Sequence, residues 1–375
     1  MVEIREMKGK KDIKKFAKFP AKLYKDCPQW VPDLIADEMD NFNPKKNPAF
    51  EFCEAKCFMA YKNGKPVGRI AAIISHKANE KWETKRIRMT RIDFIDDFEV
   101  SRALIDAVEN WGREKGLNEI HGPIGFCDLD QEGMIIEGFE HPSMFITIYN
   151  YPYYINHMEK MGFLKDTDWV EFKVFIPEKP DERIERLSNI VLKRSKLRVV
   201  RPKNKKELKK FIGPVFDVVN TAYKNLYGVV ELTDALVEKY INQFLILVNV
   251  QYIRIIIDQN DKVVGFGFGI PSLSEASKKS NGKLFPLGWY RLLRAPYKKK
   301  TIFDLYLVAV LPEMQKCGLT AVLLNEMTKV AIESNMIYAE TGPELEWNEN
   351  VISLWKSYET EQHKRRRCWI KKIEA

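Results

Sequence analysis

The chain has 375 residues, of which 45% are hydrophobic, 12% aromatic and 30% charged, and its formal net charge is +9. At roughly 100–200 residues per domain, this length predicts two domains, and the apolar content excludes wholesale disorder. A notable apolar stretch, residues 244–250, is far shorter than the roughly 20 residues that a membrane-spanning helix needs. The basic N-terminus lacks the apolar core of a secretory signal. We therefore expect a cytoplasmic protein without a transmembrane segment.

The basic residues and the cysteines exclude several classes of site. The basic residues occur in short runs, such as residues 203–210 and 298–300, and form no recognised nucleic-acid motif, so no specific nucleic-acid partner is expected. Cys53 and Cys57 fall on one face of a strand pattern in EFCEAKCFMA, which predicts core packing. The five histidines show no metal-ligand spacing, so we expect no metal site.

The first half of the chain contains a clear hairpin followed by a strand and a helix. Asn63-Gly64 joins two apolar runs in FMAYKNGKPVGRIAAI, which is a strong hairpin signal. A strand ends at residues 92–95, and the pair Asp96 and Glu99 has the spacing of a capping box. An amphipathic helix follows, and Gly116 marks its end.

Prolines at 177 and 180 interrupt the chain at its middle. We predict a first domain at residues 1–177, a connecting helix or linker at 178–196, and a second domain at 197–375. The second half has its own hairpin (IRIIIDQNDKVVGFGFGI), then a strand (FDLYLVAVLP) and a helix (AVLLNEMTKVAIES).

The two halves repeat one plan with a period of about 200 residues. Val67 and Val264 occupy equivalent places in the two hairpins, and Asn150 and Asn350 open equivalent loop-to-helix passages. Each half is expected to contain a helix, a hairpin, a strand, a helix, a strand, a helix and a final strand. The fold class is thus α/β (α+β), with a mixed, mostly antiparallel sheet flanked by helices in each half.

Residues 272–300 interrupt the second half with a polar stretch followed by an aromatic and basic one, FPLGWYRLLRAPYKKK. Three interpretations are open: a substrate-covering loop, a contact with a membrane surface or a partner, and an insertion packed on its own domain.

The strongest functional signal is the turn that follows the strand ending at Pro312. Gln315 and Gly318 lie in this turn, and a helix begins directly after it. The exposed N–H groups of a helix start, at the positive end of its dipole, form an anion site. Glycine at 318 lets the backbone approach a bulky phosphate.

Here the sequence resembles the GNAT superfamily of acyl-CoA-dependent N-acyltransferases, whose signature is Gln/Arg-x-x-Gly-x-Gly/Ala after a strand ending in Val-x-Pro. The chain has Gln315-Lys316-Cys317-Gly318-Leu319-Thr320 after Val310-Leu311-Pro312. Thr320 departs from the pattern, where glycine or alanine is usual. The hairpins and NYPYYINHMEKMGF (150–163) also match, so the whole chain resembles two GNAT domains in tandem.

The resemblance implies that acetyl-CoA, or another acyl-CoA, binds to the second half. The residues expected to hold it are Val308, Val310, Gln315, Lys316, Cys317, Gly318, Leu319, Thr320 and Asn350. In the first half the corresponding turn carries three carboxylates and no glycine, which would repel a pyrophosphate. The first domain is therefore expected to be degenerate in cofactor binding.

The resemblance also implies direct attack of a substrate amine on the thioester. Glu344 and Glu346 are the candidate bases, of which Glu346 is favoured because it lies nearer the Asn-led helix. Tyr358 is the candidate acid that protonates the departing thiolate. The prediction is an N-acyltransferase acting on an unidentified amine, with a homo-oligomer left open. The alternative is a non-catalytic CoA-binding or protein-interaction module.

Other conspicuous residues keep two interpretations each. The tyrosines at 149, 151, 153 and 154 beside His157 either line a pocket or pack in the core. The acidic side chains of Asp128, Asp130 and Glu132 either recognise a cationic amine or belong to a structured loop. The basic run at 364–367, before the strand CWIKKI, either meets a CoA phosphate or forms a solvated strand edge.

Overall fold

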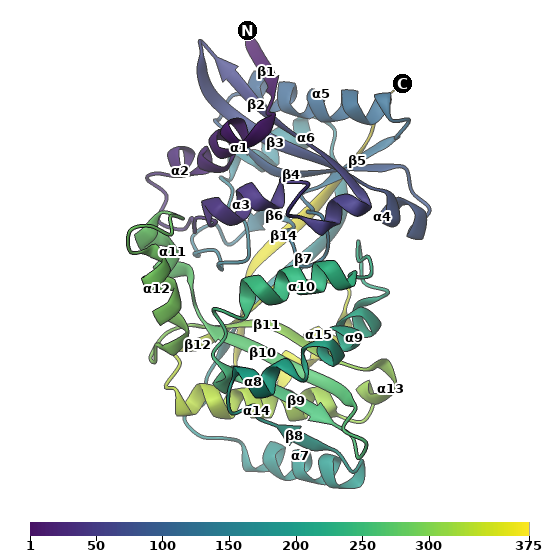
Figure 1. Cartoon of the computed structure of the whole chain (residues 1–375), viewed down its shortest axis with the longest axis vertical. Coiled ribbons are helices and arrows are strands. Elements are labelled where there is room, and N and C mark those ends of the chain that lie inside the picture. Colours follow the sequence, from purple (N-terminus) through teal and green to yellow (C-terminus); the bar gives the residue numbers. More distant parts are fainter. Residues whose placement is uncertain (375) are drawn as a thin grey trace. The chain divides into compact units, whose positions relative to one another are not determined.

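The computed structural model describes residues 1–374, without the side chain of residue 244. Residue 375, the last of the predicted second domain, lies outside the described residues. The chain folds into two compact units (Figure 1). Unit 1 comprises Met1–Val170, Ser274–Trp289 and His363–Ala375, and unit 2 comprises Glu171–Leu273 and Tyr290–Gln362. The predicted boundaries at 177 and 197 remain a prediction, while the contacts group residues 274–289 and 363–375 with the first 170.

Unit 1 is a mixed sheet with the strand order β1-β2-β3-β4-β5-β14. Its strands are β1 (Val2–Glu6), β2 (Cys53–Lys62), β3 (Lys65–Ser75), β4 (Arg86–Phe94), β5 (Glu119–Gly122), β6 (Met134–Glu137), which pairs with β14 (Thr360–Lys372), and the first part of β7 (Leu164–Phe175). Its helices are α1 (Gly9–Lys18), α2 (Pro20–Leu23), α3 (Ile35–Asn41), η1 (Pro48–Glu51), α4 (His76–Lys81), α5 (Phe98–Glu114), α6 (Tyr153–Lys160) and α11 (Ser274–Ser280).

The predicted hairpin is confirmed: β2 and β3 pair antiparallel around Asn63 and Gly64, both with positive φ. Cys53 and Cys57 of β2 are buried, as the strand pattern predicts. Helix α5 also forms as predicted, but its N-cap is Asp97 instead of Asp96, since the Asp97 side chain accepts the N–H of Glu99.

The two faces of the unit 1 sheet have different partners. A Cβ added at Gly68 would meet the Leu104 side chain of α5 at 2.8 Å, so glycine permits close packing of α5 on β3. The next residue, Arg69, points to the other face, where its guanidinium lies 4.8 Å from the ring centre of Phe16 in α1. Figure 1 shows α5 along the sheet and α1 and α3 in front of it. One face is therefore an apolar core, and the other face carries buried charges.

Unit 2 repeats the plan with the strand order β7-β12-β11-β10-β9-β8. Its strands are the last part of β7, β8 (Arg198–Val200), β9 (Ile253–Ile257), β10 (Val263–Pro271), β11 (Phe303–Val310), β12 (Tyr338–Thr341) and β13 (Glu344–Leu345). Its helices are α7 (Glu182–Arg194), α8 (Lys205–Lys209), α9 (Ile212–Tyr223), α10 (Asp234–Phe244), η2 (Val250–Tyr252), η3 (Ala295–Tyr297), α13 (Pro312–Gln315), α14 (Leu319–Glu333), α15 (Glu349–Ile352) and η4 (Ser353–Ser357). Helix α12 (Gly288–Arg294) belongs to it from Tyr290 onward.

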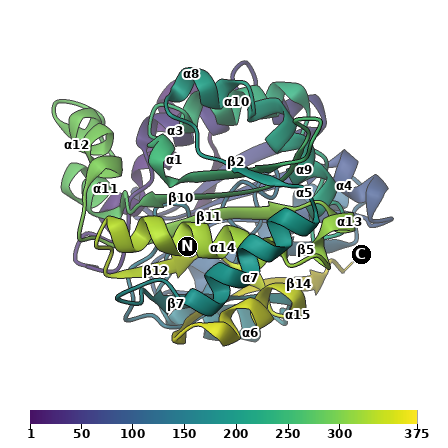
Figure 2. The same cartoon turned by 90° about the horizontal axis from the view of Figure 1, so that it is seen from below.

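Helices cover both faces of the unit 2 sheet. Gly265 and Gly267 of β10 face Leu323 and Met327 of α14, while α9 contacts β10 and β11 on the side opposite α14 (Figure 2). Helix α7, within the segment predicted as a connecting helix or linker, lies beside α14 (Figure 2). There Glu185 accepts a hydrogen bond from Asn325 at 2.9 Å and pairs with Lys329.

The last strand of each sheet does not follow the predicted order. In unit 1, β14, from the C-terminal end of the chain, pairs antiparallel with β5 through Trp369 and Gly122. In unit 2, residues 173–175 of β7 pair antiparallel with β12. The prediction that the final strand of the second half completes its own sheet is wrong, because strand pairing is a long-range choice that local patterns do not encode.

Candidate functional site

Strands β11 and β12 of unit 2 run side by side for only three residues and then part. Their parallel ladder joins Phe303–Leu305 to Ala339–Thr341, and the backbone N–H of Gly342 donates to the Leu305 carbonyl at 3.2 Å. Strand β11 continues for five more residues, to Val310. The backbone of β11 beyond Leu305 therefore leaves its parallel neighbour, as is required for a strand edge that is to bind an extended ligand.

The turn after β11 presents a helix start of the predicted kind. Gly318 has φ +80° and precedes α14, and a Cβ added there would come no closer to another residue than 3.6 Å, to the Val191 side chain. Within residues 1–374, no side chain caps the first N–H groups of α14. The side chains at 315–317 are exposed. An anionic group can thus reach the positive end of the α14 dipole without displacing a side-chain cap.

The predicted acyl-CoA residues take several positions around this turn. The carbonyl of Val308 accepts from the Tyr223 hydroxyl at 3.2 Å, and the carbonyl of Val310 accepts from Gln315 Nε2 at 3.2 Å. Leu319 is buried in the core, and Thr320 is half-buried in the first turn of α14.

Asn350, predicted to open a helix, is exposed as the second residue of α15, whose N-cap is Asn348. The helix is only four residues long and passes directly into η4. The assignment of these residues to acyl-CoA stays a prediction.

In the structure Glu344 differs from Glu346 in having a tryptophan hydrogen-bond donor and a raised pKa. Glu344 lies two residues beyond Gly342, and both of its carboxylate oxygens accept from the Trp355 indole N–H, at 2.8 and 3.1 Å. Burial raises the pKa of Glu344 to about 8, and the Trp355 hydrogen bond only partly opposes this rise. Glu346, the base favoured from sequence, lies two residues further on and is half-buried. Its role stays a prediction.

Tyr358 and Trp355 line one apolar pocket of about 330 Å³ in unit 2. The ring centres of these two residues are 6.2 Å apart. The other walls are side chains of β11, β12, α14 and the end of β7. Burial raises the pKa of Tyr358, so the phenol keeps its proton at neutral pH. Trp355 thus contacts both groups: its N–H bonds the Glu344 carboxyl, whose pKa is about 8, and its ring packs against that of the protonated Tyr358.

The corresponding turn of unit 1 is closed by its own side chains. Asp97 caps α5 and also pairs with Lys62 at 2.6 Å, and Asp96 pairs with His157 at 3.0 Å. At the end of β4 the Tyr154 hydroxyl bonds both backbone groups of Phe94, with the N–H at 2.7 Å and the carbonyl at 3.2 Å. The helix start that has no side-chain cap in unit 2 is therefore capped in unit 1, whereas the end of the preceding strand accepts side-chain hydrogen bonds in both units.

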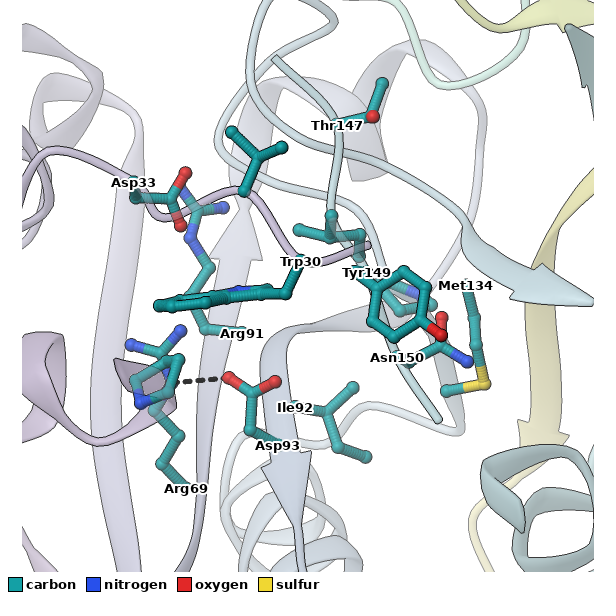
Figure 3. Close-up of a pocket in the computed structure, with 14 residues that line it drawn as sticks. Trp30, Asp33, Arg69, Arg91, Ile92, Asp93, Met134, Thr147, Tyr149 and Asn150 are labelled. Atoms are coloured by element: carbon teal, nitrogen blue, oxygen red, sulfur yellow. Dashed lines mark hydrogen bonds and ion pairs between the residues drawn. The ribbon is translucent and has the colours of Figure 1, made fainter. Parts of the chain in front are cut away.

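Unit 1 has instead a partly open pocket of about 450 Å³ on the charged face of its sheet (Figure 3). Trp30 lies on one side of it, Tyr149 and Asn150 lie on the other, and Asp93 of β4 lies between them (Figure 3). Of the tyrosine group, Tyr149 thus lines a pocket, whereas Tyr154 is fully buried in the core.

The charges around this pocket are mostly paired with one another. Arg69 donates to Asp93 at 2.7 Å. Arg91 donates to Asp130 at 2.6 Å and to Glu38 at 2.9 Å. Asp130 also accepts the N–H groups of residues 126 and 131, so it belongs to a structured loop, the second of its two interpretations.

Asp33 lines the same pocket and accepts from Gln131 Nε2 at 2.5 Å. Burial, and next the charge of Glu38, raise the pKa of Asp33 to about 7. Sequence reasoning missed Asp33, since it lies outside any motif.

Neither interpretation of the basic run at 364–367 fits its two buried members. Lys364 and Arg366 are 1% and 0% exposed, inside the sheet of unit 1, and Arg367 forms a two-pronged pair with Asp168 at 2.8 and 3.0 Å. The strand begins at Thr360, earlier than expected, and carries the run into the interior. The basic side chains there serve the fold.

One cluster of potential metal ligands lies in unit 1, where the sequence predicts no metal site. Ligand-type atoms of His121, Asp166 and Cys368 all lie within 4.8 Å of one another. Asp166, however, also pairs with Arg86 at 3.2 Å, and a neighbouring guanidinium disfavours a cation. These three residues are therefore assigned no ligand.

No protein-family model matches the sequence. The chain is 29% identical over 378 residues to "Protein YghO" of Escherichia coli (strain K12), covering 99% of this chain and 95% of that protein. It is 26% identical over 289 residues to "Bacterial ceramide synthase" of Caulobacter vibrioides, covering 75% of this chain and 73% of that protein.

Among solved structures, a "Tandem GNAT protein from the clavulanic acid biosynthesis pathway" superposes with a TM-score of 0.59 at 11% identity, covering 100% of this chain and 99% of that one. A GCN5-related N-acetyltransferase from Anabaena variabilis gives 0.51 at 8% identity, covering 100% and 73%. The tandem GNAT fold predicted from the sequence is confirmed. Within residues 1–374, no helix has both the length and the apolar character needed to cross a bilayer.

Proposed function

We propose that the chain is an acyl-CoA-dependent N-acyltransferase whose acyl donor binds to unit 2. One observation carries this proposal: in unit 2 β11 parts from β12 beyond Leu305 and leads into the uncapped start of α14. Glu344, which is half-buried and has a pKa raised to about 8, follows two residues after Gly342, whose N–H bonds the Leu305 carbonyl. In unit 1 the equivalent helix start is capped by Asp97. The tandem GNAT fold supports the same reaction class.

The residues proposed to hold the acyl donor fit an acyl-CoA. The turn offers uncapped helix N–H groups to its pyrophosphate, and β11 offers a strand edge to its extended pantetheine arm. The donor supplies an activated thioester. The amine nitrogen attacks the carbonyl carbon, an amide C–N bond forms, and the C–S bond breaks. In this proposal Glu344 accepts the proton of the incoming ammonium, and Tyr358 donates a proton to the departing thiolate. Glu346 is the alternative base.

A lipid amine is the acceptor class that we favour. The relative from Caulobacter vibrioides is named for ceramide synthesis, and ceramide is an N-acylated lipid amine. The sequence similarity covers 75% of this chain, so the acceptor of this chain stays part of the proposal. A cytoplasmic location, where acyl-CoA is available, agrees with it.

Thermal unfolding with saturating acetyl-CoA, palmitoyl-CoA, free CoA and ATP tests the donor. A ligand at about 100 times its dissociation constant stabilises the fold by roughly 2.7 kcal/mol, which gives a visible midpoint shift. A shift with the CoA compounds but not with ATP supports the proposal.

Thiol release is then measured with ethanolamine and with a long-chain amino alcohol as acceptors. CoA binding without thiol release from either amine would favour the alternative, a non-catalytic CoA-binding module. No shift with any CoA compound would refute the donor site.

A further inference from the structure

Residues 283–300 concentrate large apolar side chains on the surface. Within 13 consecutive residues, five such side chains are exposed: Phe285 (77%), Leu287 (54%), Trp289 (46%), Tyr290 (46%) and Tyr297 (64%). Scattered single apolar residues are ordinary on a protein surface, but a group this dense marks a binding surface.

Buried side chains and hydrogen bonds attach this stretch, and the residues just before it, to the fold. On the inner side of α12 and η3, Leu292 and Ala295 are 2% and 1% exposed. The Trp289 indole N–H donates to the Pro286 carbonyl at 3.1 Å, which orients the exposed ring. Just before the stretch, the Ser277 hydroxyl donates to the Pro32 carbonyl at 2.5 Å, and the Gly282 carbonyl accepts the Ile35 N–H at 3.0 Å. In unit 1 the hydrogen bonds thus anchor the chain just before Phe285, and in unit 2 the burial of Leu292 and Ala295 anchors the chain before Tyr297.

The positive charge of residues 283–300 favours an anionic partner. Residues 283–300 include six basic residues and no acidic one: Lys283, Arg291, Arg294, Lys298, Lys299 and Lys300. Tryptophan and tyrosine prefer the interface between water and lipid, and basic side chains around them attract anionic headgroups. A symmetric contact with a second copy would place the same six cations against each other, which disfavours self-association.

We propose that residues 283–300 dock the protein on an anionic bilayer surface, with Phe285, Leu287 and Trp289 entering the headgroup region and the six basic residues contacting acidic lipids. The docking is peripheral, and it does not depend on acyl transfer. Where the proposed function holds, it brings the enzyme to a membrane-borne acceptor.

Vesicle flotation of the full chain tests the proposal, with phosphatidylcholine alone and with 30 mol% phosphatidylglycerol. We expect binding to the anionic vesicles that falls at least tenfold between 50 and 500 mM salt, in keeping with screening of several charges over a shorter Debye length (about 4 Å at the higher salt). The pair Phe285→Ser and Trp289→Ala should lower the partition coefficient at least tenfold. Lys298→Glu, Lys299→Glu and Lys300→Glu, all fully at the surface, should abolish the preference for anionic vesicles without disturbing the fold.

Trp82→Ala is the matched control, because Trp82 is also an exposed tryptophan beside a lysine (38% exposed, ring centre 5.0 Å from Lys81 Nζ) but has no other exposed large apolar side chain near it in the sequence. It should bind vesicles like the wild type. Equal binding by the triple glutamate variant, an equal loss in Trp82→Ala, or no vesicle binding at all would overturn the proposal. So would dimer formation that the Phe285→Ser, Trp289→Ala pair abolishes, since that result would assign the surface to a second copy. Acyl transfer to a soluble amine is measured in parallel, so that failure of docking and failure of the enzyme are distinguished.

Discussion

Replacing Glu344 with glutamine probes the proposed base through both stability and activity. Burial raises the pKa of Glu344 from an ordinary 4.5 to about 8. At about 1.4 kcal/mol per pH unit, ionising this group in the folded chain costs up to about 5 kcal/mol. The folded chain holds this proton more tightly than the unfolded chain. The stability that the protonated Glu344 contributes is therefore fully present below pH 4.5 and is lost as the pH rises through 8.

Glutamine has the same shape, keeps an acceptor for the Trp355 indole N–H and does not titrate. In urea unfolding between pH 5 and 9, Glu344→Gln should therefore gain stability relative to the wild type as the pH rises. Its turnover should fall by about 10²–10⁴, and the wild-type kcat/KM should rise with pH toward a plateau above 8.

Glu349→Gln, on exposed α15, is the control and should follow the wild type in both measurements. If wild type and Glu344→Gln lose stability in parallel across this pH range, the pKa of Glu344 is not raised. Wild-type turnover in Glu344→Gln would remove the residue as the base.

The other predictions concern the support of this site and the contrast between the two units. Trp355→Phe removes the N–H donor that lowers the pKa of Glu344, so the rising limb of the pH–rate profile should move up by about one pH unit; an unmoved limb would contradict the role of Trp355. Gly318→Asp should abolish the midpoint shift with CoA, because it adds a side chain and a negative charge at the start of α14. Gly162→Asp, at the similar φ of +83° in unit 1, should cost the same roughly 1 kcal/mol and keep the full shift. Asp33→Asn should be more stable than the wild type at pH 8 and equal to it at pH 4 in urea unfolding, since the pKa of Asp33 is raised to about 7; equal stability at both pH values would contradict that rise.

The local signals of the sequence determined most of the elements around the site. Asn63-Gly64 can adopt positive φ, and this alone specifies a tight hairpin. The strand ending before Pro312 and the glycine at 318 specify a turn with an open helix start, because a left-handed residue is needed there. The repeat of these signals after about 200 residues made the tandem fold predictable.

The tertiary structure decided what depends on distant segments. The strand that completes each sheet was not predictable, because pairing of β14 with β5 joins residues about 250 positions apart in the chain and no local pattern selects it. The burial of Lys364 and Arg366 followed from that pairing, although a basic run by itself indicates a solvated surface. The sequence favoured Glu346 over Glu344 because Glu346 lies nearer the Asn-led helix, and only the structure showed the Trp355 hydrogen bonds and the raised pKa that distinguish Glu344. Local chemistry thus determined the turn and the strand edge, while the protonation properties of the site depended on long-range packing, because desolvation is set by the whole surrounding fold.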